Sequence, residues 1–346
     1  MSKVVLSVFF LMLSTACGVP NPEEYVNVLG GTKSQFDMSH GNILPEAQVP
    51  WGFNGWAPET DPDRGGWWFY SESARMWGIR CTHQPSPWIG DYGDFKVMGH
   101  LGPQDDAAFS AYTPSQSTWH PYYQKHTMLA YGNRFGYMTI ELSPTDHGVV
   151  LRLKYPPPSG AGNHTSAPFN QLRRVAVTLN GDHPVVNVSI GADGLVAMHG
   201  QAKLSAKRGK NGVAYFHMTV AGGNGSTAVK PFANKTHQNP GNVDFDPADV
   251  PGDTLTLRLA TSLISAEQAR ANHAAEVAGK SLDEVAQAAK AAWHGLLTRV
   301  DVDGLGPGYT AAEEGDLLTG ALLPPRLPPP DSRRPTCRPS HPHPLE

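Results

Sequence analysis

Between residues 131 and 259 the sequence alternates short apolar runs with turn-forming residues. Candidate strands cover residues 137–142, 149–155, 175–179, 185–190, 194–200, 214–220 and 254–260. A run of three prolines from residue 156 ends the second candidate, and Asn180-Gly181 follows the third as in a tight β-hairpin. Strands of this length at this spacing predict an antiparallel β-sandwich, so we expect a mainly β fold.

The region before residue 131 gives weaker signals of the same kind and shows no helical period. Residues 25–29 look like a strand, and the aromatic run 65–70 could be a core strand. Residues 78–95 contain Pro85, Pro87, Gly90 and Gly93, which predict a stiff loop because proline fixes its own φ and restricts the residue before it.

The pattern changes at Ser265, where two helices are predicted. Capping-box sequences begin at Ser265 and Ser281, and Gly279 follows the first, alanine-rich helix, which should run to about residue 278. Six apolar residues of the second helix fall on one face, and we interpret them as packing: Val285, Ala288, Ala289, Ala292, Trp293 and Leu296. The predicted division is a β-sandwich domain at 19–262 and a helical linker at 263–305.

The two ends differ from the rest of the chain. Residues 1–17 resemble a secretory signal peptide, with Lys3, an apolar run and small residues before Cys17, so we expect secretion. Cys17 also suits a lipoprotein box, which leaves a lipid anchor open as the alternative. Residues 306–346 are rich in proline and predict a disordered tail, in which His341 and His343 are weak metal-ligand candidates.

Composition narrows the classes of partner. The chain has 346 residues, a hydrophobic fraction of 40% and a net charge of −4, with no basic stripe before the tail, which argues against nucleic-acid binding. The apolar run at the start is too short to cross a bilayer, so no transmembrane segment is expected. Four N-x-S/T triplets favour a secretory pathway: Asn163, Asn187, Asn224 and Asn234.

The predicted loop of residues 78–95 carries the candidate chemistry. It brings together His83, Gln84, Trp88, Asp91 and Asp94. An indole can stack on the apolar face of a sugar while planar polar groups hydrogen-bond its hydroxyls. The alternative is a buried turn with a core tryptophan and solvated carboxylates, and the residue types alone favour this second reading.

A longer set of motifs resembles one known family. Residues 27–32, 39–42 and 50–52, followed by Gly78-Ile79-Arg80 and the run from Thr82 to Phe95, are similar to the N-terminal domain of glycoside hydrolase family 92. Residues 264–272, 291–293 and 300–302 resemble the stretch between the family's domains. The resemblance covers about residues 24–305, and the run from Thr82 to Asp94 is its most specific part.

The resemblance implies a secreted, calcium-dependent α-mannosidase, many of whose members cleave α-1,2 links. It implies a β-super-sandwich joined by helices to an (α/α)₆ toroid, with the substrate pocket between the two domains. The toroid would supply the catalytic carboxylates and nearly all calcium ligands, so we assign no catalytic residue here and expect no calcium in this chain. Trp88 matches the tryptophan beside the cleaved mannose, and the loop around it is matched by His83, Gln84, Asp91 and Arg80.

The sequence departs from the family after Leu317, where the helical domain should begin and a proline-rich stretch follows. We therefore expect a truncated mannosidase that is inactive alone, with a tail of out-of-frame or mis-spliced origin. The alternative function is a weak binding module for mannose-containing glycans. Hydrolysis by Asp91 and Asp94 alone is disfavoured because nothing fixes their separation. The face meant for the toroid, including Trp88 and Trp293, should be exposed and favour self-association.

Overall fold

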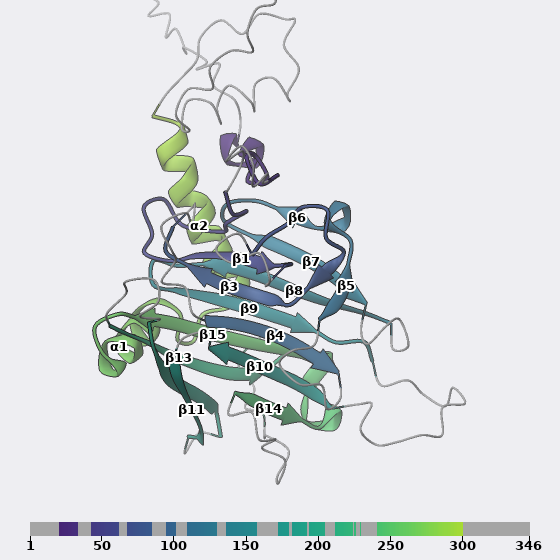
Figure 1. The fold of residues 1–346 in the computed structure, drawn as a ribbon, viewed down its shortest axis with the longest axis vertical. Coiled ribbons are helices and arrows are strands. Elements are labelled where there is room, and N and C mark those ends of the chain that lie inside the picture. Colours follow the sequence, from purple (N-terminus) through teal and green to yellow (C-terminus); the bar gives the residue numbers. More distant parts are fainter. Residues whose placement is uncertain are drawn as a thin grey trace, which may run out of the picture.

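The structure is a computed structural model, and two stacked antiparallel sheets dominate it (Figure 1). It describes residues 21–33, 43–61, 68–84, 95–101, 109–129, 136–157, 172–179, 182–191, 194–204, 212–223, 225, 229 and 241–299. The predicted signal peptide, Cys17 and the proline-rich tail lie outside the described residues. The prediction of a mainly β chain with a β-sandwich is confirmed.

The smaller sheet has five strands in the order β1-β3-β4-β10-β14. They are β1 (Gly55–Glu59), β3 (Gly78–Thr82), β4 (Phe95–Leu101), β10 (Arg173–Leu179) and β14 (Asn242–Phe245). Each neighbouring pair is antiparallel, and the register places Arg80 opposite both Ala57 and Lys96. The candidate site begins where β3 ends.

The larger sheet follows the order β11-β12-β13-β15-β9-β8-β7-β5-β2, and β6 pairs with β7. Its long strands are β7 (Gln124–Leu129), β8 (Tyr137–Pro144), β9 (Gly148–Lys154), β11 (Asp182–Ile190), β12 (Val196–Lys203), β13 (Val213–Gly222) and β15 (Thr254–Ser262). Three short strands complete it: β2 (Arg75–Met76), β5 (Ser110–Tyr112) and β6 (Thr118–Trp119). The candidate strands from 137 onward each fall on one of these strands or on β10.

The core lies between the two sheets. Trp56 of the smaller sheet is fully buried, and its indole nitrogen donates to the carbonyl of Gly148 at the start of β9, 3.1 Å away. The rings of Phe95 and Phe216 meet edge to face across the same space, with centroids 5.3 Å apart. Gly99 lies so close to Leu153 that a Cβ would sit 3.0 Å from its methyl carbon. The sandwich is therefore packed through contacts between distant parts of the sequence.

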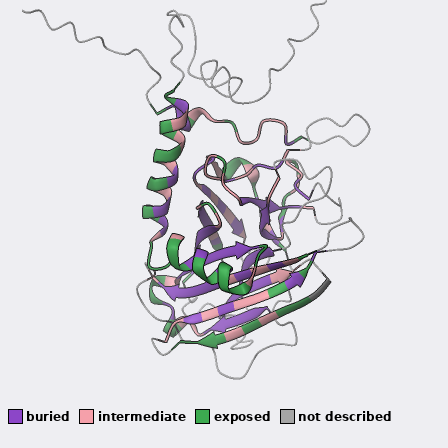
Figure 2. Ribbon diagram, turned by 90° about the vertical axis from the view of Figure 1, so that its left-hand side faces the viewer, coloured by how far each residue is buried: buried purple, intermediate pink, exposed green. Residues whose placement is uncertain are grey.

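Two helices cover part of the outer face of the larger sheet. Helix α1 (Ala266–Glu276) packs on β13 and β15, and α2 (Leu282–Leu297) packs on β8 and on the 3₁₀ turn η1 (Pro22–Tyr25). Ser265 and Ser281 cap them as predicted, the second with a full capping box. Val285 and Ala289 are buried, whereas Ala288 and Ala292 of the expected packing face are exposed, as the outward side of α2 in Figure 2 illustrates.

Two local predictions were wrong. Residues 25–29 are not a strand, because the Asn27 side chain accepts from the Leu29 amide and its carbonyl accepts from Gly30, which closes a turn. Residues 78–82 are not loop but strand β3, paired on both sides. Of the aromatic run 65–70, Trp68 and Phe69 are buried but belong to no strand.

Candidate functional site

The candidate site lies at the end of β3, where the chain leaves the smaller sheet. Arg80 is in the strand, and His83 and Gln84 follow its last residue, Thr82. Trp88 and Asp91 lie outside the described residues, so their predicted roles stay predictions. The described part of the site is therefore the strand end and the segments packed against it.

Arg80 is buried on the face of the smaller sheet that points away from the core. Its Nη1 lies 2.9 Å from Oε1 of Glu59, and Nζ of Lys96 lies 2.6 Å from Oε2 of the same carboxylate. The three side chains are 2–8% exposed. The guanidinium also lies 5.0 Å from the ring centroid of Trp68. These contacts place the guanidinium within an ion cluster that joins β1, β3 and β4.

His83 and Gln84 are half-buried at the strand end. The hydroxyl of Thr82 donates to the Gln84 carbonyl at 2.9 Å and accepts from the Gln84 amide at 3.2 Å, which turns the chain sharply. The His83 ring meets the ring of Phe53 edge to face, with centroids 4.5 Å apart. Phe53 stacks on His147 at 5.2 Å on its other side. The site is thus continuous with the turn that precedes β1.

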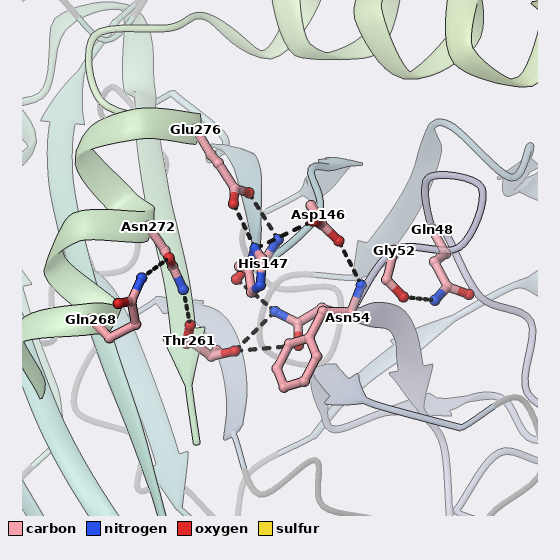
Figure 3. A network of polar contacts seen from close by, with 10 residues as sticks. Gln48, Gly52, Asn54, Asp146, His147, Thr261, Gln268, Asn272 and Glu276 are labelled. Carbon is pink, nitrogen blue, oxygen red and sulfur yellow. Dashed lines mark hydrogen bonds and ion pairs between the residues drawn. The ribbon is translucent and has the colours of Figure 1, made fainter. Parts of the chain in front are cut away.

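A polar network fixes that turn to three other elements (Figure 3). Asp146 accepts from the Phe53 amide at 2.8 Å, and Asn54 donates to the His147 carbonyl at 2.6 Å and to the Thr261 hydroxyl at 2.9 Å. Asn272 of α1 donates to the Thr261 carbonyl at 2.9 Å. The bonds of Thr261 with Asn54 and Asn272 are buried, and buried hydrogen bonds are costly to break. Together with the two more exposed bonds they connect β1, the β8–β9 turn, β15 and α1.

Asp146, His147 and Glu276 form a three-residue group with the ligand types of a metal site. Nδ1 of His147 lies 2.7 Å from Oε1 of Glu276 and 3.5 Å from Oδ2 of Asp146, while the His147 amide donates to Oε2 of Glu276. Calcium does not fit this group, because it takes six to eight oxygen ligands and here an imidazole nitrogen occupies the centre. The contacts instead describe a clamp that ties α1 to the β8–β9 turn.

Three glutamates among the described residues have a pKa below the ordinary value, which is the opposite of what a general acid needs. Burial acts to raise the pKa of Glu24, but hydrogen bonds from Lys290 and Tyr122 outweigh it and the pKa falls. Hydrogen bonds with its own backbone and with Ser265 lower the pKa of Glu267, and hydrogen bonds with Ser281 lower that of Glu284. A catalytic acid that protonates a leaving oxygen needs a raised pKa, so none of these three suits that role.

Sequence reasoning missed several residues beside the site. Phe53, Asp146, His147 and Glu276 come from three separate segments, and nothing in their local sequence announces that they meet. Trp51 lies in the motif at 50–52 that carried part of the family resemblance, yet it was not singled out. Its side chain is 88% exposed, and its backbone adopts a φ of 61°, which is uncommon for a residue other than glycine.

The two stacked antiparallel sheets define the class of the protein as a β-sandwich domain. The glycosyl hydrolase family 92 N-terminal domain matches residues 25–262. The chain belongs to this family.

Solved structures of the same family share the fold. An inverting mannosidase, BT2199 from Bacteroides thetaiotaomicron VPI-5482, is 27% identical with a TM-score of 0.67, over 87% of this chain and 39% of that one. The α-mannosidase BT3965 from the same species is 19% identical with a TM-score of 0.62, over 88% and 41%. The family glycosyl hydrolase ccman5 is 20% identical with a TM-score of 0.65, over 86% of this chain and 40% of that one. The chain therefore spans about 40% of the length of these structures.

A search of curated proteins gave no significant match. Within the described residues, neither helix has the length and apolar character needed to cross a bilayer.

Proposed function

We propose that this chain supplies the N-terminal half of a mannoside cleft in a secreted, calcium-dependent α-mannosidase of the inverting, α-1,2-cleaving type. On its own it binds mannose-containing glycans weakly and does not hydrolyse them. The observation that carries the proposal is the 27% identity to an inverting mannosidase over 87% of the chain, together with the family match.

The described residues suggest a division of labour at the strand end. Arg80 acts as a positioning residue, because its guanidinium is held by Glu59 inside the ion cluster and fixes the strand that leads to the site. His83 and Gln84 present an imidazole and an amide at the point where the chain leaves the sheet. In the proposal Trp88 stacks on the leaving-group sugar, and Asp91 bonds a hydroxyl.

The chemistry of bond cleavage belongs to residues that this proposal places in the remaining length of a family enzyme. An inverting glycosidase needs an acid and a base carboxyl group about 6.5–9.5 Å apart. Calcium is assigned to the same remaining length, since Asp146, His147 and Glu276, the one group of three possible metal ligands among the described residues, do not suit it. This chain would contribute binding and orientation of the sugar on the leaving-group side.

The proposal is tested by separating hydrolysis from binding. Purified protein incubated with α-1,2-mannobiose and calcium should release no mannose. Titration with the same disaccharide, followed by tryptophan fluorescence, should show a Kd on the order of millimolar, because a single stacked ring barely offsets the cost of association. Trp88→Ala should weaken this binding at least fivefold.

A control variant distinguishes a local effect from general damage. Phe109→Ala removes an aromatic ring, 42% exposed, that packs on Trp77 rather than on the site, and it should leave the titration unchanged. Mannose release that survives Trp88→Ala would contradict the placement of the site. A fluorescence spectrum that stays constant at high sugar concentration would contradict mannoside binding by this chain.

A further inference from the structure

A groove runs between helix α2 and the β8–β9 turn. Its volume is about 400 Å³, within the range of small-molecule sites. One wall is the N-terminal half of α2 with Val285 and Ala288, and the other is formed by Val49, Pro144 and Asp146. We refer to it as the α2 groove. Of the predicted site residues that the structure describes, Arg80, His83 and Gln84, none lines it.

Trp51 lies in the turn of residues 49–52, and Val49 at the start of this turn lines the α2 groove. The turn is closed by the Gly52 amide, which donates to the Val49 carbonyl at 2.9 Å, and Gln48 donates to the Gly52 carbonyl at 2.6 Å. Two residues that line the α2 groove therefore flank the Trp51 turn: Val49 begins it, and Asp146 holds the amide of Phe53 just after it.

The backbone of Trp51 shows that its position is imposed. A φ of 61° is unfavourable for a tryptophan and persists only where the surroundings fix it. Burial of the indole offers no compensation, because the side chain is 88% exposed. Strained residues of this kind collect at binding sites, where a side chain must be presented in one direction.

The polar groups of the α2 groove suit a neutral ligand rich in hydroxyls. Asp146 offers Oδ2, whose nearest described partner is His147 Nδ1 at 3.5 Å, and Lys280 is an exposed ammonium at the N-terminal end of α2. Acceptor and donor thus lie beside apolar walls, and the turn that carries the exposed Trp51 begins at Val49 of one wall. A sugar ring has matching faces, with C–H groups on one side and hydroxyls around the edge, whereas an anion would meet Asp146 and Glu284 as well as Lys280.

We propose that the α2 groove, with Trp51 at its rim, is a second pyranose-binding subsite that takes a mannose residue of a glycan. The inference rests on the proposed function for the identity of the sugar, whereas the α2 groove and Trp51 are defined by described residues other than the predicted site residues. It would let the domain hold a branch or a more distant sugar of the glycan whose end lies at the strand-end site.

The test isolates the α2 groove in a background that lacks the first site. Saturation-transfer NMR with methyl α-mannoside and α-1,2-mannobiose is carried out on the full chain carrying Trp88→Ala, alone and combined with Trp51→Ala or Lys280→Ala. The Trp88→Ala protein should retain a weak signal, and each second substitution should reduce it at least threefold. Tyr137→Ala is the matched control: it removes an exposed aromatic from the other end of β8, about 23 Å from Pro144 at 3.3 Å per residue.

Each outcome decides one of the two proposals. A signal that Trp88→Ala abolishes completely would overturn the second subsite and leave the first intact. A signal that Trp88→Ala leaves at full strength but Trp51→Ala removes would support the α2 groove and overturn the placement of the first site. Equal signals for the Trp51→Ala, Lys280→Ala and Tyr137→Ala combinations would overturn the α2 groove. Unchanged thermal melting of Lys280→Ala, an exposed substitution, shows that its effect comes from binding.

Discussion

Replacing Glu59 by glutamine should destabilise the domain strongly. The carboxylate accepts from Arg80 at 2.9 Å and meets Lys96 at 2.6 Å, and all three side chains are at most 8% exposed. Glu59→Gln keeps the shape but removes the negative charge that both buried cations contact. Removing one partner of a buried ion pair costs about 3–5 kcal/mol, a large part of the roughly 5–15 kcal/mol that stabilises a typical domain.

The expected shift is large enough to measure by thermal melting. For a domain of 150–250 residues, 1 kcal/mol corresponds to about 2–4 °C, so Glu59→Gln should lower the Tm by about 6–20 °C. Lys96→Met should cost less, because Arg80 keeps its partner. The variant that carries both Glu59→Gln and Lys96→Met should lose less stability than the sum of the two single losses. The difference, which is the coupling energy of the pair, should be about 0.5–3 kcal/mol.

The control is the exposed pair of Lys33 and Glu72, which has a similar distance of 2.8 Å but side chains 69% and 54% exposed. Lys33→Met should leave the Tm unchanged within error, because solvent screens exposed pairs. If Glu59→Gln melted no lower than Lys33→Met, the positioning role given to Arg80 would be refuted. A cycle of Glu59→Gln and Lys96→Met without coupling would refute the stabilising contact between Glu59 and Lys96.

Two further predictions concern acid and the helices. Burial, helped by Arg174 and Lys96, lowers the pKa of His100 to about 4, and burial lowers that of His126 to about 3, so both stay neutral in the folded state. In the unfolded chain each of these histidines binds a proton below the ordinary histidine pKa of about 6.5. The free energy of unfolding is therefore highest above that pH and decreases as the pH falls toward 4, by about 2 kcal/mol per histidine at pH 5. Urea midpoints at pH 7.5 and 5.0 measure the fall, and His126→Leu should reduce it; equal falls in variant and wild type would contradict the assignment. Ser281→Ala removes the side-chain cap of α2 and should cost about 1 kcal/mol, seen as faster amide exchange in its first turn; exchange at the wild-type rate would argue against the cap.

Elements set by local pattern were predictable from the sequence. Apart from β14, which was not predicted, the strands after residue 131 and both helices follow from apolar alternation, turn residues and capping boxes, and their observed bounds differ from the predicted ones by only a few residues. β3 was missed because all five of its residues, Gly78 to Thr82, are buried, so it lacks the alternation of apolar and polar residues that marks a half-exposed strand. It also contains a charged residue, Arg80, at a buried position. Its charge is accommodated by Glu59, a partner that the local sequence does not reveal.

The surroundings of the site were harder to predict for the same reason. His147 and Glu276 are 129 residues apart, and Asn54 and Thr261 are 207 apart. Each lies in a turn or at an element end that looks ordinary alone. The stacking of the two sheets brings Asn54 to Thr261, and the packing of α1 on the larger sheet brings Glu276 to His147. The motif at 50–52 could have suggested Trp51, but its exposure depends on a backbone angle that composition does not encode.

A crystal structure of the chain soaked with α-1,2-mannobiose tests the central claim most directly. We expect a mannose ring against the indole of Trp88, with His83 and Gln84 within hydrogen-bonding distance of its hydroxyls and Arg80 still bound to Glu59. An indole of Trp88 packed inside the sandwich, with no sugar at the end of β3, would contradict the account.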